Sequence, residues 1–477
     1  MLGLGSEATD AANASAQAPG AAAAPSGSAG GSAPAPAANS DPDPAAAAAA
    51  TPRGALATAA AHACGTALGI PQVALMFLTK GPLPHAALWA AWLGQAAGLL
   101  PADCAAASAC SAAAAPGARR KALEGLLRSC VQGGSALVER QQLFSVYVHV
   151  PPGAELEDAT GLFTPYVIEQ RVATSWGSFS LAQAVKNMLA AALEEPRNQR
   201  FLLLSESCAP LYPPAVVYQQ AMYTSKSKIN SCTGDPDWPL DTYRFERPMG
   251  PMTAGRLTKD MWRKSHQWMG LVRKHAQTAV DDVEIARAFE EHCWNGYDPR
   301  GPDGWRSCYS DEHYFPTLLA INGMEQETDC AGRLTSTDWC HTPDGERCRG
   351  AASLHPREYF AQDISPALLQ RLRAPAGRAC DPAAALASAV GGFTNAAALA
   401  AGSNCTGGLP QPALLGPHCP LFARKFANDS APHTLQALLG LLTREQVDIM
   451  RAHAAGAGRY SEGGPGRMMK REARRMR

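Results

Sequence analysis

The most informative group of ionisable side chains in this sequence lies between a cysteine and a proline. The segment Cys308–Thr317 reads CYSDEHYFPT and places Asp311, Glu312 and His313 next to one another. A carboxylate within hydrogen-bond reach of a hydroxyl can take its proton as a general base, which accelerates a reaction by about 10²–10⁴-fold. A solvated turn is the plain alternative for the same residues.

A second carboxylate pair has the form of a metal site. Asp235-Pro236-Asp237 matches the Asp-x-Asp pattern with which many nucleotide-sugar transferases hold a divalent ion. A proline between two aspartates, in a stretch rich in glycine, tryptophan and proline, is more typical of a turn, so we expect no metal there. The GxGxxA pattern at residues 3–8 lacks the preceding strand that dinucleotide binding needs. No GxSxG elbow and no P-loop is present, so hydrolase and kinase-type functions have no motif to support them.

The segments that would position these residues alternate between strand and helix. Apolar runs predict strands over 73–79, 144–150, 166–172 and 201–205. Apolar spacing predicts helices over 84–93, 180–195, 258–277, 281–293 and 434–453, with a short one opened by Pro213-Pro214. This order predicts an α/β fold with a mainly parallel central sheet. Glu206 directly follows the last of these strands, where parallel sheets place their ligands.

Length and charge limit the domain count and the class of partner. The 477 residues carry 42 basic and 42 acidic side chains, and this zero balance gives no reason to expect nucleic acid as a partner. Residues 1–65 are rich in Ala, Pro and Ser and are predicted to be disordered. We therefore expect one catalytic-size domain over 66–456, with low-complexity insertions near 101–118 and 374–403, and a basic tail over 457–477.

Cysteine usage indicates an oxidising compartment. The chain has 14 cysteines, none in CxxC spacing, which disfavours a zinc ribbon or a thioredoxin-type motif. An even number of dispersed cysteines is typical of a disulfide-bonded luminal or secreted protein. A cytosolic interaction protein with free thiols is the alternative. We find neither a signal peptide nor the run of about 20 apolar residues that a membrane span needs.

Several ordered blocks of the sequence resemble a known family. They are MFLTKGPLP from Met76, FSVYVH from Phe144, WGS from Trp176, FLLLSESCAP from Phe201, DEHYFPT from Asp311, Asp338-Trp339, and LFARKF from Leu421. Over about residues 71–443 the chain resembles the plant-type core-2/I-branching β-1,6-N-acetylglucosaminyltransferases, glycosyltransferase family 14. The resemblance implies a GT-A-like fold with a disulfide-rich C-terminal part. It also implies inverting transfer of a sugar, N-acetylglucosamine first, from a UDP-sugar to a glycan or glycoprotein hydroxyl.

The resemblance also implies where the chemistry lies. The glutamate of the Asp-Glu pair is the family base, which is Glu312 here, with Asp311 as its orienting neighbour. No metal and no cofactor beside the UDP-sugar donor is expected, so cationic side chains must neutralise the leaving diphosphate. The residues implied for the diphosphate are Lys425 and Arg424, and those implied for the acceptor side are Trp339, Asp338 and Glu206. Glu206 is also the second choice for the base.

Two departures from the family pattern leave alternatives open. Gly402 stands where animal members carry a second diphosphate-binding arginine, and Arg371, Arg373 or Arg424 would have to replace it. In the segment Trp262–Trp268, Ser265 and His266 stand where the family usually has Gly-Ser. The missing arginine favours, as an alternative, a non-catalytic relative that binds glycans or nucleotides. Transfer of xylose or glucuronic acid is a further alternative within the family. The resemblance also implies that the protein is located in the Golgi lumen and attached to a membrane.

Overall fold

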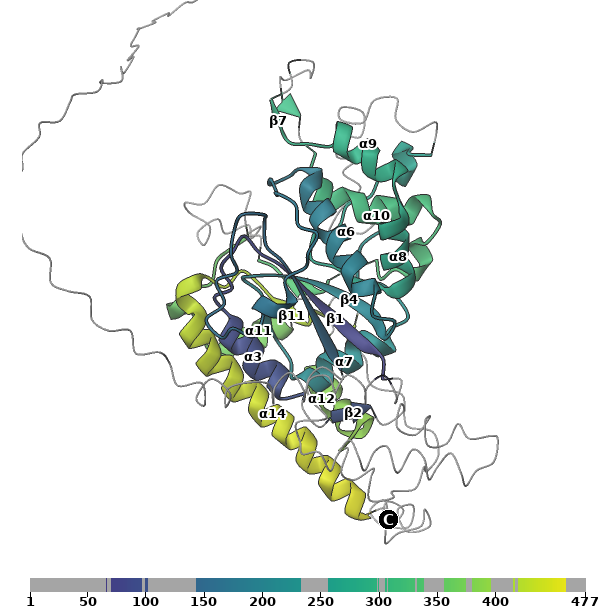
Figure 1. Ribbon diagram of the computed structural model, residues 1–477. Helices are drawn as coiled ribbons and strands as arrows, with labels where there is room; N and C mark the ends of the chain where they lie inside the picture. Colours follow the sequence, from purple (N-terminus) through teal and green to yellow (C-terminus); the bar gives the residue numbers. More distant parts are fainter. Residues whose placement is uncertain are drawn as a thin grey trace, which may run out of the picture. The chain divides into compact units, whose positions relative to one another are not determined.

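The computed structural model (Figure 1) describes the central part of the chain and the helix that follows it. The residues described are 66, 70–96, 99–101, 143–232, 256–297, 299, 305–306, 308–330, 333–338, 356–374, 380–395, 415–416 and 419–459. The predicted disordered segment 1–65 and most of the insertion 101–118 lie outside these residues.

The core of the protein is a four-stranded, mainly parallel sheet. Its strands are β1 (Gln72–Leu78), β3 (Phe144–His149), β4 (Asn198–Ser205) and β6 (Gly270–Val272), in the order β3-β1-β4-β6. β1 is parallel to both of its neighbours, and β6 is antiparallel to β4. All seven residues of β1 are buried, as a continuous apolar run between two helical layers requires.

Alternate residues of β1 divide the core into two halves. Val73, Leu75 and Phe77 pack with α3 (Ala86–Gly94), α7 (Pro214–Tyr223) and α14 (Ala431–Arg459). Ala74, Met76 and Leu78 pack with α6 (Phe179–Leu193), α8 (Arg273–Asp281), α9 (Glu284–His292) and α10 (Ser310–Ile321). Figure 1 shows α6, α8, α9 and α10 grouped on one side of β1 and β4, with α3 beside α14 on the other.

A small second sheet brings the C-terminal region to the end of β4. It contains β5 (Ala209–Pro210), β11 (Phe422–Ala423) and β9 (Thr335–Ser336), with β11 in the centre. Because β5 follows β4 closely, β11 and the residues after it lie near the carboxyl end of β4. The two remaining strand pairs are β10 (Phe393–Asn395) with β2 (Leu99–Pro101), and β7 (Gly296–Tyr297) with β8 (Trp305–Arg306).

Short helical elements complete the described part of the chain. They are α11 (Pro366–Arg373), α12 (Pro382–Gly392), and the 3₁₀ turns η2 (Thr164–Tyr166), η4 (Lys259–Met261), η5 (Glu325–Glu327), η7 (Ala361–Asp363) and η8 (Asn428–Ser430). α12 and β10 fall inside the stretch 374–403 that composition marks as an insertion. α14 is longer than the expected helix 434–453 and runs three residues into the segment 457–477.

The predicted α/β class with a mainly parallel sheet is confirmed, but two predicted elements are wrong. Residues 166–172 do not form a strand: Val167 makes an isolated bridge to Val148, and the polar residues after it leave the sheet. Of the predicted helix 258–277, only the 3₁₀ turn η4 and the residues from Arg273 onward are helical. Residues 270–272 form the strand β6 instead, in which Gly270 pairs with β4 so closely that a Cβ there would lie 2.9 Å from Leu202.

Disulfides join segments of the C-terminal half, as cysteine usage predicts. The pairs are Cys232–Cys330, Cys293–Cys308 and Cys380–Cys419, and Cys208 is a buried free thiol. Disulfides of this kind fit an oxidising compartment. Within the described residues, none of the helices combines the length and the apolar character needed to cross a membrane.

Candidate functional site

The Asp-Glu pair lies in the first turn of α10, and a proline one turn later determines what docks there. Pro316 has no N–H to give to the carbonyl four residues before it, which belongs to Glu312. That carbonyl instead accepts the backbone N–H of Ser265 at 2.9 Å. The spacing of Glu312 and Pro316 therefore creates a docking point for the segment Trp262–Trp268.

Two further side chains of α10 bind the backbone of the same segment. The Nδ1–H of His313 donates to the carbonyl of Arg263 at 2.8 Å, and Thr317 Oγ1 accepts the N–H of Arg263 at 3.0 Å. Trp262 stacks on the His313 ring, with centroids 4.5 Å apart. Burial, reinforced by Lys264, lowers the pKa of His313 to about 3, so this histidine is neutral and acts here as a backbone clamp.

This docking places Lys264 beside Glu312. Lys264 Nζ lies 3.2 Å from Glu312 Oε2, and each side chain is 21% exposed. The ion pair holds the Glu312 carboxylate in one position while leaving part of it exposed to solvent. Lys264 was not predicted from the sequence, although it lies in the segment that matches the family imperfectly.

Asp311 has a different environment from its neighbour. Burial, reinforced by the adjacent Glu312 carboxylate, raises the pKa of Asp311 to about 7. Its Oδ1 is buried and has no hydrogen-bond partner among the described residues. The two neighbouring carboxyl groups thus differ in environment: Asp311 has a buried oxygen without a partner in the described part of the chain, whereas Glu312 is paired with Lys264 and partly exposed.

The raised pKa predicts a pH dependence of stability. The folded protein holds a proton on Asp311 up to about pH 7, whereas the unfolded chain releases it near pH 4, so this group stabilises the fold at low pH and costs stability as pH rises through that window. Asp311→Asn copies the neutral form. We expect it to be more stable than the wild type at pH 8, by up to about 4 kcal/mol, with a smaller difference at pH 5.

Thermal unfolding of both proteins between pH 5 and pH 8 measures this effect. Asp281→Asn, at an exposed aspartate of α8, is the matched control and should show no such trend. A stability difference for Asp311→Asn that stays constant across the pH range would contradict the prediction.

The predicted cations directly follow β11. Lys425 forms an ion pair with Glu358, and its side chain is 31% exposed. The guanidinium of Arg424 lies 4.4 Å from the centre of the Trp268 ring, and the Arg424 N–H donates to the Ser336 carbonyl at 2.9 Å. Lys425 therefore presents an accessible charge, whereas Arg424 is held against an aromatic ring.

Glu206 belongs to this cationic group rather than to the α10 carboxylates. Burial lowers the pKa of Arg424, and electrostatic interactions with Cys208, Glu206 and Glu358 oppose that shift. Glu206 directly follows β4, as the sequence predicts, and its charge acts on Arg424. This position favours a role in orienting the arginine.

The segment Trp262–Trp268 connects the carboxylate and cation groups. Lys264 contacts Glu312, and Trp268 contacts Arg424. Four residues of extended chain span at most about 14 Å, which is the upper limit for the distance between the Cα atoms of Lys264 and Trp268. Arg263, which belongs to this segment, forms an ion pair with Glu325 at 2.6 Å and so fixes the segment to the 3₁₀ turn η5.

Other predicted residues have separate positions. The Asp338 carbonyl accepts the N–H of Arg357 at 2.7 Å. Arg373 binds Glu445 at 2.6 Å and the Leu211 carbonyl at 2.7 Å, which commits it to holding α11 against α14 rather than to a diphosphate. Trp339, Gly402, Asp235 and Asp237 lie outside the described residues, within which no cluster of three or more metal-ligating side chains occurs.

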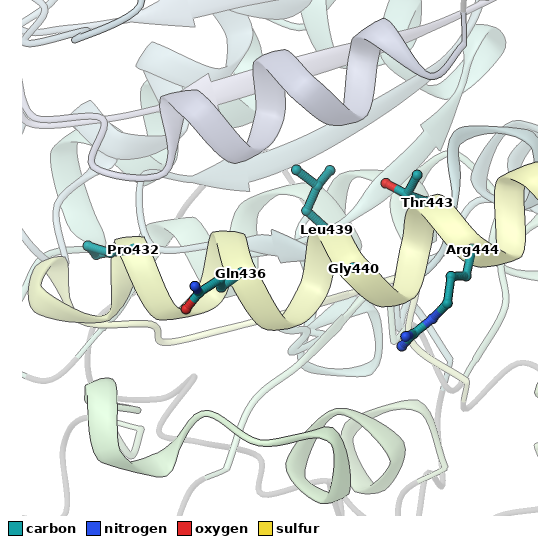
Figure 2. Close-up of a pocket in the computed structure, with 6 residues that line it drawn as sticks. All are labelled: Pro432, Gln436, Leu439, Gly440, Thr443 and Arg444. Atoms are coloured by element: carbon teal, nitrogen blue, oxygen red, sulfur yellow. The ribbon is translucent and has the colours of Figure 1, made fainter.

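An open groove on α14 lies apart from these residues. It has a volume of about 680 Å³ and is lined by Pro432, Gln436, Leu439, Gly440, Thr443 and Arg444 (Figure 2). All six belong to one helix, and none is a predicted site residue. Thr443 Oγ1 accepts a hydrogen bond from Gln95 at 2.9 Å, so the groove follows the packing of α14 on α3.

Comparison with known proteins identifies the family. Residues 134–373, just over half of the chain, match the model of the core-2/I-branching enzymes. Over 250 residues the chain is 34% identical to glycosyltransferase BC10 of Oryza sativa subsp. japonica, a match that covers 49% of this chain and 59% of that relative. The family match includes Glu312, Lys264 and Glu206 but ends before Arg424 and Lys425. The chain belongs to the core-2/I-branching enzyme family.

Proposed function

We propose that this protein is an inverting glycosyltransferase that works without a metal ion. It moves a sugar, N-acetylglucosamine first among the candidates, from a UDP-sugar to a hydroxyl of a glycan or glycoprotein. The observation that carries the proposal is the accessible Glu312 carboxylate, fixed on α10 beside Lys264 while its neighbour Asp311 is buried. Family membership and the named glycosyltransferase relative support the reaction class.

The proposed reaction is a single displacement. The acceptor oxygen attacks the anomeric carbon, and its proton passes to the Glu312 carboxylate. The bond from the anomeric carbon to the diphosphate oxygen breaks, and its electron pair leaves with UDP. Lys425, exchanging Glu358 for the diphosphate, neutralises the charge that develops there, and Arg424 adds a second positive charge nearby.

The disulfides and the family suggest where the reaction takes place. Three disulfides in the described residues require an oxidising environment during folding. We propose the Golgi lumen, where sugar nucleotides and glycan acceptors occur together. A non-catalytic relative is the second candidate function, because Gly402 removes one expected cation and Arg373 is committed to Glu445.

The test is UDP release by the purified full-length chain in a donor panel with EDTA present. UDP-N-acetylglucosamine, UDP-xylose and UDP-glucuronic acid are each supplied with and without a mixture of neutral oligosaccharides. We expect acceptor-dependent UDP release for one donor, unchanged by EDTA. Loss of turnover on chelation, restored by manganese, would contradict the metal-free mechanism and draw attention back to Asp235 and Asp237. Calorimetric UDP binding with no turnover for any donor would support the non-catalytic relative instead.

A further inference from the structure

Trp176 is an exposed aromatic side chain held in a fixed position close to the candidate base. Its side chain is 51% exposed, whereas the large aromatic side chains of the core are fully buried. Its ring packs against Tyr309, with centroids 5.0 Å apart and planes at 65°. An aromatic side chain that is both exposed and packed against a second ring offers a ligand a broad apolar face.

The backbone under Trp176 requires close contact with Tyr309. Gly177 has φ of +74°, which favours glycine, and a Cβ at this position would lie 3.2 Å from both the Tyr309 ring and the Asn295 side chain. Any larger residue would therefore push Trp176 away from Tyr309. The Trp-Gly pair thus supplies an exposed ring and the space to seat it.

The Tyr309 side of the Trp176–Tyr309 contact is held by a disulfide and a hydrogen bond. The disulfide Cys293–Cys308 joins the segments that carry Asn295 and Tyr309. Ser310 Oγ donates to the Cys293 carbonyl at 2.6 Å. Rigid placement of an exposed aromatic ring reduces the entropy lost when a ligand binds to it.

The turn that carries Trp176 is held by its own side chains. Ser178 Oγ donates to the Ser175 carbonyl at 3.0 Å, and Ser180 Oγ accepts the Ser175 N–H at 2.9 Å. Both ends of the Trp176–Tyr309 contact are thus fixed independently of any ligand.

The Trp176–Tyr309 pair lies next to Glu312. The Tyr309 carbonyl accepts the Glu312 N–H at 3.1 Å, so the two residues share the first turn of α10. Three residues advance about 4.5 Å along a helix, so the backbone that carries Tyr309 lies within one turn of the backbone that carries the candidate base. The Asn295 side chain lies beside the backbone of Gly177.

We propose that Trp176 and Tyr309 form an acceptor subsite that binds the apolar face of a neutral sugar ring adjacent to the hydroxyl that reacts. This inference rests on the proposed glycosyl transfer and deepens it. An indole ring offers a broad apolar face suited to the C–H face of a pyranose, while hydroxyls around the sugar's edge remain free for hydrogen bonds. Trp176 determines acceptor specificity in this proposal and takes no part in bond breaking.

The experiment compares the wild type, Trp176→Ala and Trp176→Phe, with Tyr223→Ala as the control for loss of an exposed aromatic residue elsewhere. Binding of N-acetyllactosamine and β-1,4-xylotetraose is measured by saturation-transfer NMR, and acceptor and donor KM are measured by UDP release. We expect Trp176→Ala to raise the acceptor KM roughly 10-fold or more and to lose the saturation-transfer signal. Trp176→Phe should recover part of both effects, and Tyr223→Ala should resemble the wild type. Donor KM and acceptor-independent hydrolysis should not change.

Any other result either overturns the acceptor subsite or supports it. Unchanged acceptor KM and NMR signal in Trp176→Ala would overturn it, as would an equal loss of donor hydrolysis, which would make Trp176 a donor or folding residue. A tryptophan-dependent KM for a serine-containing peptide, with none for the oligosaccharides, would overturn the sugar as the occupant. Oligosaccharide binding that depends on Trp176 in a protein without transferase activity would support the subsite while the proposed function fails.

Discussion

Glu312→Gln is expected to reduce sugar transfer by about 10²–10⁴-fold while leaving UDP affinity unchanged. Glutamine keeps the size and shape of the side chain but cannot accept the acceptor's proton. The fold should tolerate the change, because the hydrogen bond that docks Ser265 uses the Glu312 backbone carbonyl rather than its carboxylate. The substitution also removes the ion pair with Lys264, whose side chains are each 21% exposed, so thermal unfolding of the variant checks that the fold is kept.

Glu284→Gln is the matched control for this substitution. Glu284 is also a glutamate in the first turn of a helix, and it forms an ion pair with Arg256 at 2.7 Å. It should show wild-type turnover. UDP titration by calorimetry separates a chemical defect from a binding defect. Near-normal turnover of Glu312→Gln would refute the assignment of the base, and a parallel loss of UDP affinity would place Glu312 on the donor side.

Strands β1, β3 and β4 could be predicted from the sequence because each contains an apolar run, whereas β6 lies in a stretch expected to be helical. The runs that include Leu75, Val146 and Leu203 need no alternation, so a continuous apolar stretch identifies them directly. α10 was not predicted, although it carries the central motif. Pro316 interrupts the pattern expected of a helix interior, and its structural consequence, a free Glu312 carbonyl, depends on a segment far away in the sequence.

The sequence predicts candidate residues for the site but not their ion-pair partners. The resemblance indicated Glu312 and Lys425, yet it did not indicate that Lys264 and Glu358 are their partners. These ion pairs depend on how segments distant in sequence meet. Lys264 had a local signal, since it lies in a segment flanked by two tryptophans that the family comparison singled out. For Glu358 the sequence contains no comparable signal.

Lys425→Ala is expected to lower turnover by about 10²–10³-fold and to weaken UDP binding, because an accessible cation next to the leaving diphosphate would be lost. Lys425→Arg should retain much of both properties. Lys274→Ala is the matched control, since Lys274 is also paired with a surface glutamate, Glu327. Calorimetric UDP titration and UDP-release assays measure the effect.

The ion pair between Lys425 and Glu358 leads to a second prediction, for the UDP affinity of a Glu358 variant. If Lys425 must leave Glu358 to bind the diphosphate, Glu358→Gln removes the competing carboxylate and should bind UDP at least as tightly as the wild type. Opposite effects of Lys425→Ala and Glu358→Gln on UDP affinity would thus identify the lysine as the diphosphate ligand. If both variants weaken UDP binding equally, the pair acts as a structural unit. The charge that stabilises the leaving group must then come from another cation, and Arg424, next to Lys425 in the sequence, is the first candidate.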